Sequence, residues 1–299
     1  MMKKISYNLE MIDLFQKSVT LSKSNSIHKI IQPKLVISKL LEKMFLFNNK
    51  TLTIYAVTFW NERMRVVIPE IVSISIYRYG YFEEGLTRMV LEYLKPGMTF
   101  IDIGSHFGYF TLLSSYIVGE TGKVHAFDPT KSTFEMLKLN TEGKKNVILN
   151  NLAVSSKKGR VSINDYGIRY SAWNSLHNAR LPERVMRKLK PLRYDVNTLS
   201  VDEYINENNV KPDFIKIDAE SHEYEILSGM NQTIDKYHPI ITVEVGDFDI
   251  EGVPSSRKII EFLIDKGYQP YEYIEGNIII HEPREKYSYD NIIFLPKNR

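Results

Sequence analysis

The sequence predicts an α/β fold: a mostly parallel sheet of seven strands, with helices on both faces and an antiparallel strand at its C-terminal end. From Thr99 onward, short apolar runs alternate with stretches of helical periodicity, as in parallel strands joined by crossover helices. The last apolar runs have no helix between them, which favours an antiparallel ending. A chain of 299 residues can hold this core together with an N-terminal extension.

The residues before Thr99 predict an extension that is helical first and then rich in β-structure. Apolar side chains recur at helical spacing and define one face of a helix: Ile37, Leu40, Leu41, Met44 and Phe47. We expect this face to pack on the same domain or on a second copy in a homodimer. Residues 52–79 predict a hairpin or small antiparallel sheet, and a helix over 82–94 stops at Lys95-Pro96-Gly97. The predicted parts are therefore a helical extension (1–50), a hairpin with a helix (51–95) and a core domain (96–299).

The core domain alternates strands and helices along most of its length. Candidate strands are 100–103, 123–128, 147–154, 213–218, 239–245, 271–274, 277–280 and 291–295, and candidate helices are 108–118, 131–141, 222–236 and 255–267. Residues 164–195 lack strand periodicity and carry seven Lys or Arg against three acids, so we interpret them as a cationic insertion beside the ligand site.

Composition excludes several classes of protein. The apolar fraction of 43% and the charged fraction of 25% are typical of globular proteins, and a net charge of +3 selects no partner. Without cysteine there is no disulfide and no thiolate metal site. No signal peptide and no apolar run of about 20 residues are found, so we expect a cytoplasmic protein without stable membrane insertion.

The stretch "FIDIGSHFGYFT" (100–111) predicts a ligand-binding turn after the first core strand. Ligands of open α/β sheets bind at the carboxyl ends of the strands, and Gly104 and Gly108 allow a sharp turn there. Asp102 suits a cationic ligand and repels phosphate, which disfavours a dinucleotide. Asp128 ends the second strand, where an acid can accept hydrogen bonds from ribose hydroxyls, and Asn151 and Ala153 lie in the third strand, where an adenine edge could be read. A ligand with ribose, adenine and a cationic amino-acid end is S-adenosylmethionine.

The chain resembles the FkbM family of S-adenosylmethionine-dependent methyltransferases, which have the class I Rossmann-like fold. The resemblance rests on "KPGMTFIDIGSHFGYFT", "GKVHAFDP", "NLAVS", "TLSVDEYI", "FIKIDAESHEYEILSGM" and "PIITVEV". Ser105-His106, Asp128 and Ser221 depart from the Ala-Asn, Glu and Gly common in the family, and Ser221 is expected to alter its turn. The residues assigned to cofactor binding are Asp102, Gly104, Ser105, His106, Phe107, Gly108, Thr111, Asp128, Pro129, Asn151, Ala153 and Asp218.

Candidates for proton removal from an acceptor hydroxyl cluster after the fourth and fifth core strands. Lys216 and Asp218 share one strand face, and Glu220, His222 and Glu244 lie near the same edge. His222 is the leading general base by hypothesis, because its ordinary pKa is near neutrality; alternatively it only begins the following helix. A second mechanism, less favoured for lack of further oxygen ligands, has Asp218 and Glu244 hold Mg²⁺.

The resemblance implies O-methylation of a hydroxyl on a sugar, glycan or polyketide-like natural product. Within the insertion, Trp173, Asn174, Ser175 and His177 are candidates to bind the acceptor, and Arg180, Arg184 and Arg187 are candidates to bind its phosphate or carboxylate. The alternatives are an RNA 2′-O-methyltransferase and a cofactor-binding scaffold without catalysis. The nearly balanced net charge and the lack of a basic stripe with interleaved aromatic residues disfavour the RNA alternative, and we expect no DNA partner.

Overall fold

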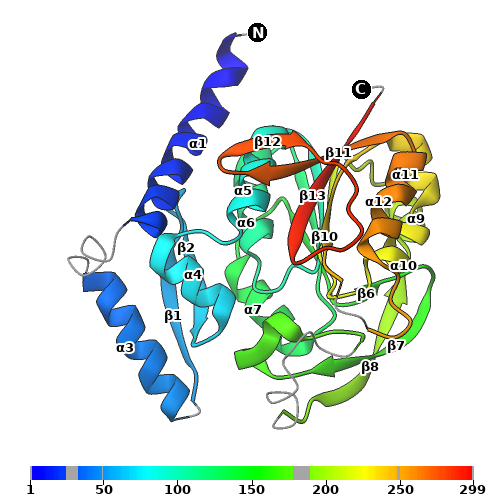
Figure 1. The fold of residues 1–299 in the computed structure, drawn as a ribbon. Helices are drawn as coiled ribbons and strands as arrows, with labels where there is room; N and C mark the ends of the chain where they lie inside the picture. Colours follow the sequence, from blue (N-terminus) through cyan, green and yellow to red (C-terminus); the bar gives the residue numbers. More distant parts are fainter. Residues whose placement is uncertain (1, 25–32, 49, 178–188, 248–249, 298–299) are drawn as a thin grey trace.

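The computed structural model describes residues 2–24, 33–48, 50–177, 189–247 and 250–297. Within them the main sheet has eight strands in the order β12-β11-β13-β10-β9-β3-β4-β5 (Figure 1). The parallel strands are β3 (Thr99–Ile103), β4 (Lys123–Phe127), β5 (Val147–Asn150), β9 (Phe214–Ile217) and β10 (Ile240–Val245). The antiparallel strands are β11 (Tyr268–Ile274), β12 (Asn277–Ile280) and β13 (Asp290–Pro296).

Both faces of this sheet are apolar and covered, as the sequence predicts. Phe100 and Phe214 lie on one face, with ring centroids 5.2 Å apart, while their neighbours Ile101 and Ile215 point to the other. Helices with buried residues on the first face are α5 (Glu84–Tyr93), α6 (Tyr109–Val118) and α7 (Lys131–Asn140). Those on the second face are α9 (Val201–Asn208), α10 (Glu223–Ser228), α11 (Asn231–Tyr237) and α12 (Ser256–Asp265).

The sheet differs from the expected one in strand number. Residues 268–280 form a hairpin in which β12 pairs only with β11, and this adds an eighth strand at the edge. The candidate strand over 147–154 is also interrupted, because β6 (Ala153–Val154) leaves the main sheet and pairs with β8. The antiparallel ending is confirmed, although it consists of three strands and not one.

The insertion begins and ends in strands, contrary to expectation. β7 (Gly159–Asp165) and β8 (Leu192–Leu199) pair antiparallel, and β6 completes a three-stranded sheet. After β7 comes a 3₁₀-helix, η1 (Ile168–Trp173), which ends on Trp173, the first of the residues predicted to bind the acceptor. Arg180, Arg184 and Arg187 lie outside the described residues.

The N-terminal extension packs on the same chain. It contains α1 (Met2–Lys23), which lies within the predicted helical extension, the expected helix α3 (Pro33–Phe47), and a hairpin of β1 (Leu52–Val57) and β2 (Arg63–Ile68). Phe15 of α1 contacts Phe59 and Tyr81, each with ring centroids 5.3 Å away. The face of α3 that carries Leu40 and Phe47 is exposed, and a homodimer through it stays a prediction.

Residues 71–79 form helix α4 (Ile71–Tyr79), although their β-branched side chains indicated a strand. The Glu70 carboxylate accepts hydrogen bonds from the backbone N–H groups of Val72 and Ser73, which caps the helix, and Gly80 ends it in the left-handed conformation. Capping therefore outweighs β-propensity in this segment. No helix in the described part of the chain has the length and apolarity to cross a membrane.

Candidate active site

A cavity of about 510 Å³ opens at the carboxyl ends of the parallel strands, within the usual size range for small-molecule sites. The chain runs from β3 through β4 and β5 on one side, and β9 and β10 lie on the other, so β3 and β9 flank the point where the strand order reverses. The cavity is lined by the turn after β3, by the tips of β4, β9 and β10, by η1 and the residues after it, and by α4 and Glu83.

The turn after β3 is required by packing within the protein. Gly104 has a φ of 78°, and a Cβ on it would lie 1.7 Å from the carbonyl oxygen of Asp218. A Cβ on Gly108, where φ is 93°, would lie 2.6 Å from Cδ1 of Leu137. The two glycines therefore bring the turn against the tip of β9 and against α7, whereas the sequence suggested that they make room for a ligand.

Asp102 stands behind the cavity wall in a buried charge network. It is opposite Lys216 in the register of β3 and β9, and its Oδ1 lies 3.4 Å from the Lys216 Nζ. Its Oδ2 accepts a hydrogen bond from the Thr111 hydroxyl at 2.6 Å. Lys216 also pairs with Asp218 at 3.2 Å. Burial alone would lower the pKa of Lys216, but the charges of Asp218 and Asp102 raise it, so this lysine stays charged. Lys216 lines the cavity, and the Asp102 carboxylate is linked to the cavity through this ion pair.

Asp128 lines the cavity just after β4. Its Oδ1 accepts hydrogen bonds from the Thr130 N–H and the Thr133 hydroxyl, and its Oδ2 accepts one from the His106 N–H at 3.0 Å. Burial raises the pKa of Asp128 to about 7, against the opposing effect of these bonds. Oδ2 retains acceptor capacity, which suits the hydroxyl role predicted for this acid.

The other residues assigned to the cofactor are divided between the cavity and its support. Ser105, His106, Pro129 and Ala153 line the cavity, as do Gly104, Asp128 and Asp218, whereas Asp102, Phe107, Gly108, Thr111 and Asn151 do not. Ser105 donates to the Asp102 carbonyl at 2.8 Å, and Asn151 donates to the Asp128 carbonyl at 2.9 Å. These bonds hold the two strand tips in position.

His106 joins the turn after β3 to the insertion. Its Nε2 lies 2.7 Å from the Ser171 hydroxyl of η1, and its ring stacks on Phe107 at 3.9 Å. Burial and, secondarily, the charge of Lys216 lower the pKa of His106 to about 3. The ring is therefore neutral at physiological pH and adds no charge to the cavity.

Three carboxylates lie together at the tips of β9 and β10. Oxygens of Asp218, Glu220 and Glu244 are all within 4.8 Å of one another, and all three residues line the cavity. Glu220 and Ser221 have φ values of 50° and 81°, so the turn that carries this cluster is left-handed at a serine where the resembling family commonly has glycine. The sequence placed these acids at one edge, and the structure brings them into one group.

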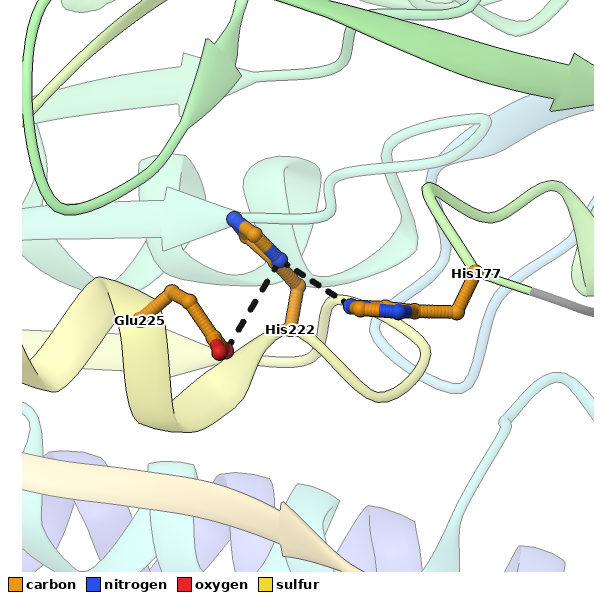
Figure 2. Close-up of side chains that lie close together, drawn as sticks. All are labelled: His177, His222 and Glu225. Carbon is orange, nitrogen blue, oxygen red and sulfur yellow. Dashed lines mark hydrogen bonds and ion pairs between the residues drawn. The ribbon is translucent and has the colours of Figure 1, made fainter. Parts of the chain in front are cut away.

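His222 precedes α10 with both ring nitrogens engaged. Its Nε2 lies 2.9 Å from the Ser155 hydroxyl, and its Nδ1 lies 3.3 Å from Nε2 of His177 (Figure 2). Burial, and then His177, lower the pKa of His222 to about 4. A base of this strength, with both nitrogens occupied, is poorly suited to take a proton from an acceptor near neutral pH.

The residues predicted to bind the acceptor lie at the end of η1 and just after it. Trp173, Asn174 and Ser175 line the cavity, and the Ser175 hydroxyl donates to the Glu220 carbonyl at 2.7 Å. His177 is not part of the lining and is directed toward His222.

Glu83 is a cavity residue that no sequence pattern indicated. It precedes α5 with a φ of 44°, and neither carboxylate oxygen accepts a hydrogen bond of normal geometry from the described residues. Burial, and next the charge of Asp218, raise the pKa of Glu83 to about 8. A buried acid that is largely neutral at pH 7 in a cavity is a common feature of functional sites, and only the three-dimensional fold reveals it.

A mixed sheet of this order, with a ligand cavity at its switch point, defines the Rossmann-like fold of class I methyltransferases. The family model described as the methyltransferase FkbM domain matches residues 102–270. The chain belongs to this family of S-adenosylmethionine-dependent methyltransferases.

The hexuronic acid methyltransferase AglP of Haloferax volcanii is 26% identical to this chain over 161 residues, which are 53% of this chain and 61% of that protein. Two solved structures are similar at low identity. The methyltransferase FkbM of Methylobacillus flagellatus is 13% identical, with 74% of this chain and 52% of that chain covered and a TM-score of 0.39. The fibrillarin of Aeropyrum pernix, bound to S-adenosylmethionine, is 11% identical, with 68% of each chain covered and a TM-score of 0.40.

Proposed function

We propose that this methyltransferase moves a methyl group from S-adenosylmethionine to a hydroxyl oxygen of a sugar-type acceptor. The observation that carries the proposal is the arrangement of acids along one cavity. Asp128 follows β4, and the carboxylate cluster of Asp218, Glu220 and Glu244 lies at the tips of β9 and β10. β4 and β10 are separated by β3 and β9, so their tips are about 14 Å apart. One cavity thus has an acid for a ribose and, at a distance, acids for an acceptor.

The residues of the β4 side fit an adenosine. The Asp128 Oδ2 has one protein donor and can accept another from a ribose hydroxyl. Phe127, Leu152 and Ala153 give the neighbouring wall an apolar surface for a base. Glu83 supplies an acid for a cationic amino-acid end, and the charge of a bound ammonium would draw Glu83 toward its ionised form.

When bound, S-adenosylmethionine supplies a methyl carbon on a sulfonium, which an acceptor oxygen attacks as the carbon–sulfur bond breaks. The protein must hold the acceptor hydroxyl in line and take its proton. We assign the proton to the carboxylate cluster and not to His222, since both His222 nitrogens are engaged. Lys216 lies 3.2 Å from Asp218, so a positive charge stands beside the cluster.

A sugar ring is the acceptor that best suits the remaining wall. Trp173 offers an aromatic face, and Asn174 and Ser175 offer polar groups beside it. The Asn174 Nδ2 is buried without a hydrogen-bond partner among the described residues, so a donor is available for an acceptor oxygen. The similarity to a hexuronic acid methyltransferase supports the same class of acceptor.

The test is a methyl-transfer assay with the full chain, isotopically labelled cofactor, and three acceptors: a uronic acid glycoside, a neutral hexoside and an RNA oligonucleotide. We expect a labelled methyl ether on a glycoside, located by NMR. A methyl ester on the uronic carboxyl, or methylation of RNA alone, would overturn the hydroxyl or the sugar assignment. Calorimetric binding of the cofactor without transfer to any acceptor would instead indicate a scaffold.

A further inference from the structure

A second polar cluster, which the proposed reaction does not use, lies at the edge of the cavity. It consists of His177, after η1, and of His222 and Glu225, at the start of α10 (Figure 2). His222 and Glu225 are three positions apart, so they lie on one side of the first helical turn. His177 approaches them from the insertion, so the cluster joins two segments that are distant in sequence.

The three side chains direct ligand atoms at one point. Nδ1 of His222 lies 3.3 Å from Nε2 of His177 and 3.8 Å from Oε2 of Glu225, and the three residues each place one ligand atom within 4.8 Å of the others. Nitrogen and oxygen ligands about 2.1 Å from a tetrahedral zinc ion are separated by about 3.4 Å. The distances of 3.3 Å and 3.8 Å therefore differ from this separation by only a few tenths of an ångström.

The hydrogen bonds around the cluster point to the same conclusion. Oε2 of Glu225 is buried and has no hydrogen-bond partner among the described residues, and 3.8 Å from the His222 ring is too long for one. On the far side of the His222 ring, Nε2 lies 2.9 Å from the Ser155 hydroxyl. Metal-bound histidines commonly donate their second ring N–H to such an outer partner, which directs the lone pair of the first nitrogen to the ion.

We propose that His177, His222 and Glu225 form a binding site for Zn²⁺ or a similar divalent transition-metal ion. Two imidazoles and one carboxylate suit such an ion, whereas Mg²⁺ and Ca²⁺ prefer oxygen ligands. The ion would tie the insertion to α10 and so fix Ser175 and Leu176, which line the cavity two residues and one residue before His177. The three protein ligands leave a fourth position for water or for an acceptor oxygen.

The experiment is a calorimetric titration of the metal-free full chain with Zn²⁺. We expect one ion to bind per chain. His177→Ala and Glu225→Gln should each weaken binding by at least about 100-fold, since even outer-shell partners of metal sites contribute about 10- to 100-fold. His238→Asn is the matched control: it removes a histidine in the left-handed position after α11, at the entrance of β10, and should bind Zn²⁺ like the wild type. Circular dichroism of each variant checks that it folds.

A Co²⁺ titration gives a second readout that does not depend on activity. We expect the intense visible absorption of four-coordinate Co²⁺ in the wild type and in His238→Asn, and its loss in Glu225→Gln. Absence of Zn²⁺ binding by the wild type would overturn the proposal. So would binding that both His177→Ala and Glu225→Gln retain, or binding that Glu244→Gln abolishes, because the ion would then belong to the carboxylate cluster.

Discussion

Two polar clusters each take two residues from the same short segment, residues 218–225, and they differ in chemistry. The carboxylate cluster of Asp218, Glu220 and Glu244 has oxygen atoms only, lines the cavity and has the charge of Lys216 beside it. The cluster of His177, His222 and Glu225 has two nitrogens and one oxygen, and only His222 reaches the cavity. One turn thus separates groups suited to accept a proton from groups suited to hold a transition-metal ion.

The difference arises from how the turn is built. Glu220 and Ser221 both adopt left-handed backbone angles, and the chain reverses direction between Asp218 and His222. Acids before the reversal remain at the strand tips, while side chains after it begin α10 and meet the insertion. Proximity in sequence therefore does not imply a shared function, and the clusters should respond differently to substitution.

The largest effect on stability is expected at Gly104, which packs against the start of the segment that both clusters share. Gly104→Ala would put a Cβ 1.7 Å from the Asp218 carbonyl oxygen, and backbone atoms on both sides would have to move. We expect it to lower the free energy of unfolding by more than about 4 kcal/mol, as only exceptional substitutions do, or to prevent folding. Gly143→Ala is a matched control, because φ is 80° there but nothing lies within 4 Å. It should cost only about 1–2 kcal/mol. Equal losses in urea unfolding would contradict the close-contact argument.

The next largest effect is a difference in kcat between substitutions in the two clusters. Glu244→Gln removes a proton acceptor from the carboxylate cluster, and we expect kcat to fall by about 100-fold or more, in line with general-base catalysis. Glu225→Gln should change kcat by less than about 10-fold, because a cluster that acts on the reaction only by positioning contributes less. Single-turnover kinetics measure the rate of methyl transfer in each variant, and calorimetry measures cofactor binding separately. A larger loss in Glu225→Gln would reverse the assignment of the base.

The pH dependence of stability tests the raised pKa of Glu83, a cavity residue outside both clusters. Its pKa is about 8 in the fold, above the ordinary value of 4.5, mainly because of burial and then of Asp218. Between these values the folded state keeps a proton that the unfolded state has lost, so stability falls as pH rises through this window. Glu83→Gln should match the wild type near pH 4.5 and exceed it by on the order of 1–3 kcal/mol at pH 9. The exposed control Glu120→Gln should leave the urea-unfolding curve close to that of the wild type. A Glu83→Gln curve parallel to the wild type would contradict the raised pKa of Glu83.

Sequence reasoning predicted the sheet and named many of the residues that line the cavity, while their roles stay predictions. Asp128, Asp218 and Glu244 follow or end strands, and the strand pattern alone brings strand tips to one edge. The role of Asp102 could not be predicted, because its partner Lys216 is 114 positions away and only the register of β3 and β9 makes them neighbours. Glu83 and the contact between His177 and His222 depend on packing between distant segments, which periodicity does not report.

The smallest effect is expected from Mg²⁺, and it sharpens the contrast between the clusters. The carboxylate cluster brings Glu220 to the Asp218 and Glu244 pair and so offers a hard cation three residues with oxygen ligands. However, Lys216 already supplies a positive charge 3.2 Å from Asp218, and an added dication would be repelled by it. The protein for this test is freed of magnesium and loaded with Zn²⁺. We expect added Mg²⁺ to change its kcat by less than about 2-fold, because the electrostatic effect is weak. The opposite result would be that the wild type is active only with Mg²⁺ and that Glu220→Gln is inactive even with Mg²⁺. The carboxylates would then be metal ligands, and proton transfer would need a base elsewhere in the cavity.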